Sequence, residues 1–524
     1  MNAKLKELYN NGLVWIKSFF WILLVFLLAF LFRYFLIVAN PYIQTDEPST
    51  FYISSPSVVS ESSAFFKQDW GNFNIEKQRF YSGAEFNNLL FKPDSSIKSM
   101  LEDLRLTRLQ TMDRQHPSLY FSLVRIWDNY LGDFDKDKYL IHARKLNLVF
   151  FCLSFFFLYK LLALIKDDKN FITLALVFAF FNVGSISLAV LAREYALQEA
   201  FFILVTYFAL ILFKKIDSNE KITIKTTILG ALAFALFLDS GYFSVVYFVM
   251  LGTLLLIKSA LKNPRAILNL IIMFLLSIIF TWVLCPNYFD FKTNNEHYSS
   301  VASAFSVIGF FVDTKVLETS FIYLLKNLLY PFILYLVSLI VLLSRFDLIV
   351  LEESFTKKEK NIVSCLVLLA AFWIFGVLFL TPYKCLRYFA AGIPIFSLII
   401  LLMFSQIKLY MRRILAVAFV MFTLITYTTG VWYDTYDRSV IYQEETTNSL
   451  PSVVVNPTFF FLDYAFLSLN ENNIVRFEEK INLKHLPIKG LYKLVCDENT
   501  RPKTKATPKN IWNMRVYIMS NPNS

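Results

Sequence analysis

Four short stretches of this sequence carry ionisable or phenolic side chains that could bind or activate a substrate. They are Asp46-Glu47, Asp113 with His116, Arg193-Glu194, and Lys384 with Arg387 and Tyr388. A carboxylate can accept a proton or hold a metal ion, and histidine can also do both. Arginine and lysine bind phosphate and other anions. Each stretch alone also has an ordinary explanation as a helix cap, an ion pair or an interfacial anchor, so their value depends on whether they share one face.

The composition decides what kind of elements must position these residues. Hydrophobic residues make up 56% of the 524 residues and charged residues only 17%, whereas a soluble protein carries about 25% charged residues. A membrane-spanning helix needs roughly 20 apolar residues, and many runs reach or approach that length. The net charge of +11 does not indicate nucleic-acid binding, because Lys and Arg cluster in short loops between apolar runs, as in membrane proteins. The sequence therefore predicts an all-α polytopic membrane protein.

The apolar runs predict about 11 spans, the first of which is a retained signal anchor. They cover residues 15–39, 145–165, 171–190, 197–213, 226–239, 240–257, 266–285, 320–343, 362–381, 388–406 and 413–431. With this count, the basic loops near 160–169, 214–225, 258–265, 357–360 and 408–413 all fall on one side. The positive-inside rule makes that side cytoplasmic, with the N-terminus. The stretch 117–131 is short for a span and is interpreted as an interfacial or re-entrant helix.

The same count places all four chemical stretches on the opposite, outer face. The first outer loop covers 40–116, and residues 1–432 form the predicted membrane domain. The tail 433–524 is predicted to be a small outer α/β domain, because its apolar runs shorten to strand length at 452–456, 473–477, 491–496 and 513–519. A helix is expected at 457–470. Whether Cys285, Cys385 and Cys496 form a disulfide is left open.

The stretches occur in an order that resembles a known group of enzymes. Asp46-Glu47 follows the first span, and Asp113-Arg-Gln-His116-Pro-Ser-Leu-Tyr120 resembles an Asp-x-x-His-Pro-Pro-Leu-Tyr element, with Ser118 in place of the second Pro. Further elements are Tyr130-Leu-Gly132 followed by Arg144, Arg193-Glu194-Tyr195-Ala-Leu, and Arg387-Tyr388 with Pro394. As a set they resemble the GT-C glycosyltransferases of the group that contains protein O-mannosyltransferases and the lipid A aminoarabinose transferase.

This resemblance implies sugar transfer at the outer face, with inversion, from a polyprenyl-phosphate donor to an acceptor hydroxyl. Asp46 is expected to be the general base, and Glu47 or Glu194 to orient the acceptor or hold a metal. The candidate phosphate-binding cations are Arg193, Lys384 and Arg387. Asp113, His116 and Tyr388 are further site candidates, and His116 could be a ligand, a phosphate donor or structural. A divalent cation is the one cofactor that this chemistry could use, although the spacing shows no ligand set.

Two other functions remain open at this stage. One is an O-antigen or polysaccharide polymerase or ligase, and the other is a lipid-linked sugar transporter or flippase, for which Asp239 beside Gly241 is the suggestive site. The expected partners are the polyprenyl-phosphate sugar, a glycan, lipid or protein acceptor and the lipid bilayer, with no nucleic acid. The expected location is a bacterial inner membrane, with the C-terminal domain in the periplasm. The sequence names neither the sugar nor the acceptor.

Overall fold

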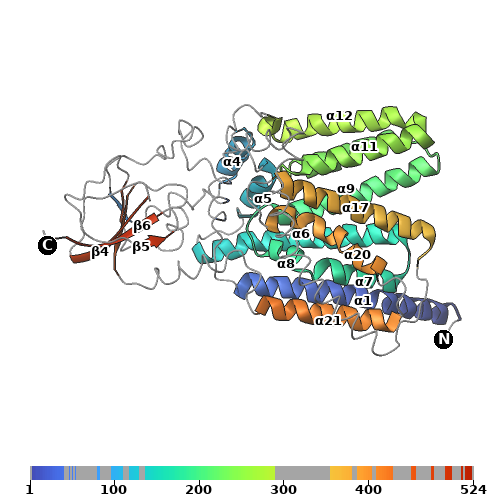
Figure 1. The fold of residues 1–524 in the computed structure, drawn as a ribbon, viewed down its shortest axis with the longest axis horizontal. Coiled ribbons are helices and arrows are strands. Elements are labelled where there is room, and N and C mark those ends of the chain that lie inside the picture. The colour runs from blue at the N-terminus through green and yellow to red at the C-terminus, as the bar shows by residue number, and fades with distance from the viewer. Residues whose placement is uncertain are drawn as a thin grey trace.

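The computed structural model describes a helical bundle joined to a β-sheet (Figure 1). It describes residues 3–39, 47, 50, 54, 80–82, 96–109, 117–128, 136–289, 355–380, 386–403, 409–428, 450–455, 474–476, 490–497, 509–511 and 514–521. The longer helices are α1 (Ala3–Ala39), α4 (Ile97–Leu109), α5 (Ser118–Asp128), α6 (Lys136–Ile165), α7 (Lys169–Phe180), α9 (Tyr195–Asp217), α10 (Ile224–Leu238), α11 (Ser244–Lys262), α12 (Ile267–Leu284), α17 (Lys357–Leu380) and α21 (Leu409–Thr428). Short helices are α8 (Val183–Ala189), α18 (Leu386–Phe389), α19 (Ile393–Phe396), α20 (Leu398–Met403), η3 (Pro264–Ala266), η4 (Pro286–Phe289) and η7 (Ala390–Gly392).

Each predicted span that falls on described residues corresponds to a helix or to a pair or series of shorter helices. Among the described residues, six helices are long and apolar enough to cross a membrane, or seven if one bent pair counts as a span. The predicted span 320–343 and the predicted tail helix 457–470 lie outside the described residues. The chain is thus a multi-pass membrane protein, while the count of 11 spans stays a prediction.

The predicted span at 171–190 is a bent pair of helices and not one continuous helix. The helix stops at Phe180, and α8 restarts at Val183 at an angle of 64°. Asn182 causes the restart, because its side-chain oxygen accepts a hydrogen bond from the Ser185 amide and caps α8. Arg33 of α1 donates to the Phe180 carbonyl at the break, so this polar backbone group is satisfied within the protein interior.

The predicted span at 388–406 is also interrupted. Here the chain forms α18, η7, α19 and α20 in succession, because Pro394 cannot continue a helix that begins before it. The turn packs closely on α17, since a Cβ added at Gly392 would lie 2.8 Å from the Trp373 ring. This short turn carries Arg387 and Tyr388 at its start.

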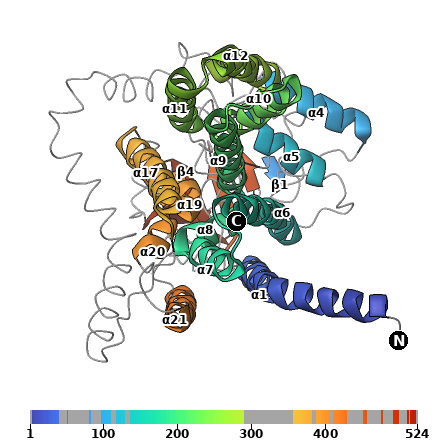
Figure 2. The same cartoon turned by 90° about the vertical axis from the view of Figure 1, so that its right-hand side faces the viewer.

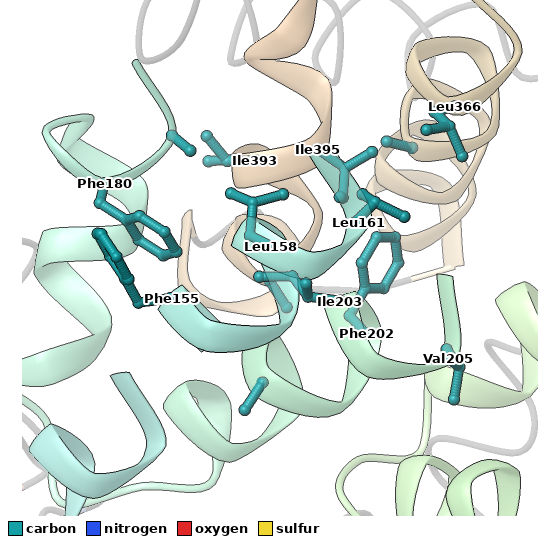
Figure 3. Packing of buried hydrophobic residues seen from close by; sticks show 14 of the residues in the cluster. Phe155, Leu158, Leu161, Phe180, Phe202, Ile203, Val205, Leu366, Ile393 and Ile395 are labelled. Atoms are coloured by element: carbon teal, nitrogen blue, oxygen red, sulfur yellow. The ribbon is translucent and has the colours of Figure 1, made fainter. Parts of the chain in front are cut away.

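A single large apolar core fixes the bundle (Figure 3). Leu158 of α6 lies beside Ile203 of α9 and near Ile393, whereas Phe155 of α6 packs against Phe180 of α7 with ring centres 5.4 Å apart. The short helix α5 belongs to the same core through Tyr120, Phe121 and Val124. Aromatic residues supply much of the buried area, so the core also fixes the ends of α5, α6 and α9 that carry polar side chains.

The sheet contains the predicted tail strands and two others. Its strands are β1 (Phe80–Ser82), β2 (Ser452–Val455), β3 (Ile474–Arg476), β4 (Gly490–Asp497), β5 (Lys509–Ile511) and β6 (Met514–Asn521), in the order β1-β3-β2-β4-β6-β5. Strands β2, β3, β4 and β6 confirm the four predicted strands. The unpredicted strand β1 comes from the first outer loop and pairs antiparallel with β3, so the sheet joins that loop to the tail.

The two ends of the bundle differ in chemistry. Figure 1 places the N-terminus at one end of the molecule and the sheet at the other, and Figure 2 shows the bundle from the N-terminal side. The basic loops meet at one end, because Lys214 donates to the Leu164 carbonyl at 2.6 Å and Arg413 donates to Asn170 at 2.8 Å. Lys258 also pairs with Asp217 there, at 2.6 Å. This shared end is what the predicted alternation of spans requires.

Cysteine labelling in intact spheroplasts tests which end faces the cytoplasm. Ser82, Ser218 and Ser520 are all exposed. In a variant whose native cysteines are replaced by alanine, we expect Ser82→Cys and Ser520→Cys to react with an impermeant maleimide. Ser218→Cys should react only after lysis. Labelling of Ser218→Cys together with protection of the other two would invert the topology.

Candidate active site

The centre of the candidate site is a buried ion pair between two stretches of the sequence motif. Arg144 of α6 donates to Glu47 from Nε at 2.8 Å and from Nη2 at 2.7 Å, and both side chains are at most 1% exposed. The Ala192 amide donates to the same carboxylate at 2.7 Å. A bidentate pair with an added amide satisfies a buried carboxylate. Glu47 therefore fastens the first outer loop to α6 and to the turn before α9.

That turn, residues 190–194, is held from two further directions. The Asn147 amide donates to the Leu188 and Ala189 carbonyls at 3.3 Å and also bonds the Leu191 carbonyl. The Thr50 hydroxyl donates to the Ala192 carbonyl at 2.7 Å. Because its backbone groups are fixed by α6 and the first loop, the turn presents Arg193 and Glu194 in a set position.

Arg193 and Glu194 are buried beside an aromatic wall. Their Nε and Oε2 atoms lie 3.3 Å apart, and each side chain is at most 3% exposed. The guanidinium also lies 5.9 Å from the centre of the Phe121 ring of α5. The neighbouring Tyr120 is fully buried, and its hydroxyl has no hydrogen-bond partner in the part of the chain that the structure describes. Burial, followed by the charge of Glu194, raises the pKa of Tyr120 well above 10, so its hydroxyl stays a hydrogen-bond donor.

The late turn places a second cation against α9. The Arg387 guanidinium lies 5.2 Å from the Tyr388 ring centre and 5.9 Å from that of Tyr195. The two tyrosine rings meet edge to face at 5.9 Å, and Arg387 also donates to the Tyr388 hydroxyl at 3.5 Å. Arg387 is only partly buried. Since Tyr195 directly follows Glu194, the two arginines flank the start of α9.

The structure thus brings together five of the predicted site residues, and four lie outside its description. The five are Glu47, Arg193, Glu194, Arg387 and Tyr388; Asp46, Asp113, His116 and Lys384 lie outside the described residues. The sequence motifs include Arg144, Tyr120 and Tyr195, but the sequence alone assigned these residues no role in binding or catalysis. The signal for Arg144 was available, because an arginine near the start of a spanning helix needs an anionic partner.

Within the described residues, no group of three or more His, Cys, Asp or Glu side chains is arranged to hold a metal ion. Glu47 is engaged by Arg144 and the Ala192 amide, which favours a positioning role for it over metal binding. The carboxylate of Glu194 lies beside Arg193, and its charge also acts on Tyr120. The arrangement combines fixed cations, a protonated phenol and a buried acid, which can bind an anion and orient a neutral hydroxyl.

Comparison with known proteins gives solved structures of low sequence identity that match most of the chain. No protein-family model and no curated protein matches the chain. Among solved structures, ArnT from Cupriavidus metallidurans bound to undecaprenyl phosphate is 11% identical, with a TM-score of 0.47 over 95% of this chain and 98% of that one. Its apo state gives 10% identity and a TM-score of 0.44 over 95% and 97%. The archaeal oligosaccharyltransferase AglB from Archaeoglobus fulgidus, in complex with an inhibitory peptide and a dolichol-phosphate, is 10% identical. Its TM-score is 0.40 over 93% of this chain and 70% of that one.

Proposed function

We propose that this protein is a glycosyltransferase that moves a sugar from a polyprenyl-phosphate donor to an acceptor hydroxyl at the outer face of the membrane. The observation that carries the proposal is the convergence of motif residues from separate parts of the chain. Glu47, Arg144, the Ala192 turn and Arg387 are far apart in sequence, yet they surround the start of α9. A bundle that needed only packing would not require this concentration of buried charge.

The chemistry at this position supports the proposed donor class. The two arginines at the outer ends of spanning helices suit an anion at the membrane surface, and a polyprenyl phosphate presents its anion there with its chain in the lipid. Hydrolysis or transfer breaks the bond between the anomeric carbon and the phosphate oxygen, so negative charge builds on the leaving phosphate. Fixed guanidinium groups stabilise that charge without reorganising.

The acceptor hydroxyl needs a base, because an alcohol is a weak nucleophile until its proton is removed. Asp46 is the proposed base, next to the fastened Glu47, and attack opposite the phosphate would invert the anomeric centre. Glu194 and the Tyr120 hydroxyl are proposed to orient the acceptor. Whether a divalent cation shares the phosphate-binding role is tested by assaying turnover with added Mg²⁺ or Mn²⁺ against a chelator.

Arg387 is the proposed clamp for the donor phosphate. Arg193 is almost fully buried with Glu194 beside it, whereas Arg387 is partly exposed and its guanidinium faces two tyrosine rings. A planar guanidinium can hold two phosphate oxygens at once, but lysine acts as a point charge. Arg387→Lys should therefore reduce turnover by roughly ten-fold or more, and Arg387→Ala should reduce it further, with weaker donor binding in both.

Donor binding and turnover of these two variants are measured separately with undecaprenyl-phosphate sugars. Tyr388→Phe is the matched control, since it keeps the ring under Arg387 and removes only the weak hydroxyl contact. If Arg387 were an interfacial anchor, Arg387→Lys would match the parent, because lysine reaches the interface equally well. That result would leave Lys384 or Arg193 as the clamp.

The tail is proposed to help capture the acceptor, because its sheet is joined to the first outer loop through β1 and β3. Removal of residues 448–524 should reduce transfer to the full acceptor more than hydrolysis of the donor by water. Both rates are measured on the same purified preparation. Equal loss of both rates would make the tail a structural element only.

The two alternative functions receive less support from the site. A polymerase or ligase would use the same class of donor, so only the identity of the acceptor distinguishes it from the proposed glycosyltransferase. A flippase would use ionisable groups near the middle of the membrane. Asp239, the residue suggested for that role, follows the last residue of α10 and lies at a helix end.

A further inference from the structure

We propose that the end of the bundle opposite the candidate active site contains a binding site for one anionic phospholipid. A cavity of about 970 Å³ lies between α9, α11 and α17. Its polar mouth includes Lys214 and Asp217 near the end of α9, whereas Tyr195 and the candidate site are at the start of that helix. With 23 residues, α9 is about 35 Å long, so the two sites lie near opposite surfaces of a membrane.

The mouth of the cavity is strongly basic. The described residues that line it include Lys214, Lys258, Lys357, Lys358 and one acid, Asp217, which together carry a net charge of +3. Asp217 is occupied by Lys258 at 2.6 Å. Within the part of the chain that the structure describes, Lys357 and Lys358 take part in no ion pair. The site therefore has cationic groups left to bind an anion.

The floor of the cavity is apolar. Leu210 and Phe213 of α9, Leu251 of α11 and Leu366 and Leu369 of α17 line the cavity and lie farther than the lysines from the basic ends of these helices. Cys365 of α17 lines the same cavity and is exposed. A basic mouth above an apolar floor matches a molecule that is anionic at one end and hydrocarbon at the other.

These features favour a phospholipid over a soluble anion. A nucleotide or free phosphate would use the lysines but would leave the leucine and phenylalanine surface in contact with water, without the gain from burying it. Basic pockets between spanning helices on the cytoplasmic side are the general form of sites for anionic headgroups. The site is separate from the proposed transfer reaction, and its existence does not depend on that reaction.

Native mass spectrometry of the full chain in detergent tests the site with phosphatidylglycerol as the probe. We expect one tightly bound phosphatidylglycerol and much weaker binding of phosphatidylcholine. The double variant Lys357→Gln with Lys358→Gln should weaken phosphatidylglycerol binding by roughly 30-fold, since each lysine near an anionic lipid contributes about five-fold. The matched control is Lys221→Gln with Lys225→Gln, which removes two exposed lysines outside the cavity and should bind as the parent does.

Alkylation of Cys365 locates the bound lipid in the parent protein. Phosphatidylglycerol should slow modification of the Cys365 peptide by N-ethylmaleimide, and water-soluble glycerol phosphate should not. Equal binding by the two double variants, equal binding of phosphatidylcholine, or protection by glycerol phosphate alone would each overturn the proposal. Since both lysines are exposed, their replacement should leave the fold unchanged.

Discussion

Asp46→Asn is expected to lower the rate of sugar transfer by about 10²–10⁴-fold, the usual contribution of a general base. Asparagine keeps the shape of the side chain but cannot accept the proton of the attacking hydroxyl. Donor binding should remain, because the proposed phosphate contacts come from Arg193 and Arg387. The measurements are single-turnover transfer and donor affinity on the same purified protein.

Glu47→Gln is the matched control, because it makes the same chemical change at the adjacent residue. Glu47 accepts hydrogen bonds from Arg144 and from the Ala192 amide, so its amide variant should lower thermal stability. Asp46→Asn should unfold at the temperature of the parent protein. Near-normal transfer by Asp46→Asn would refute its assignment as the base, and Glu194 would then be the next acid to test.

Breaking the Glu47–Arg144 pair is expected to have the second large effect. Arg144→Met removes two charge-assisted hydrogen bonds from the buried Glu47 carboxylate, which keeps the hydrogen bond from the Ala192 amide. Loss of one member of a buried ion pair costs about 3–5 kcal/mol. We expect a clearly lower unfolding midpoint in detergent, and a further loss of turnover in the protein that remains folded, because the pair positions the first loop.

Arg125→Met provides the comparison. Arg125 pairs with Asp103 at 2.6 Å, and both side chains are fully buried between α4 and α5, so its loss should destabilise the protein similarly. Turnover per folded molecule should fall more in Arg144→Met than in Arg125→Met. The combined variant Glu47→Gln with Arg144→Met should recover part of the lost stability, since no buried charge remains. Equal turnover in the two single variants would reduce the Glu47–Arg144 pair to a structural role.

The membrane helices were predictable because hydrophobic length is a strong signal. Residues 171–190 show where that signal fails, since a window of mean hydropathy does not detect the cap at Asn182 or the remote donor Arg33 that stabilises the break. The same applies to Gly392 and Pro394, which shape a turn within an otherwise apolar run. In each case a few polar or steric contacts, some local and some between helices, decide the backbone path.

The site was predictable in its residue types but not in its pairings. The predicted spans placed Glu47, Arg193 and Arg387 on one face, because loops separated by an even number of spans lie on the same side of the membrane. That Glu47 engages Arg144, 97 residues away, depends on how α6 packs against the first loop. Likewise, β1 has only three residues and joins β3 across almost 400 residues, which a local pattern cannot reveal.

The most direct test of the central proposal is the fate of the bond between sugar and phosphate. Purified protein in vesicles is incubated with undecaprenyl phosphate carrying a radiolabelled hexose or pentose. The acceptors are outer-surface lipids and exported proteins from cells that lack this chain. The proposal predicts that labelled acceptor and free undecaprenyl phosphate appear in equal amounts, and that Asp46→Asn abolishes both. Intact donor with every sugar tested, or movement of intact donor across the vesicle membrane, would contradict a transferase.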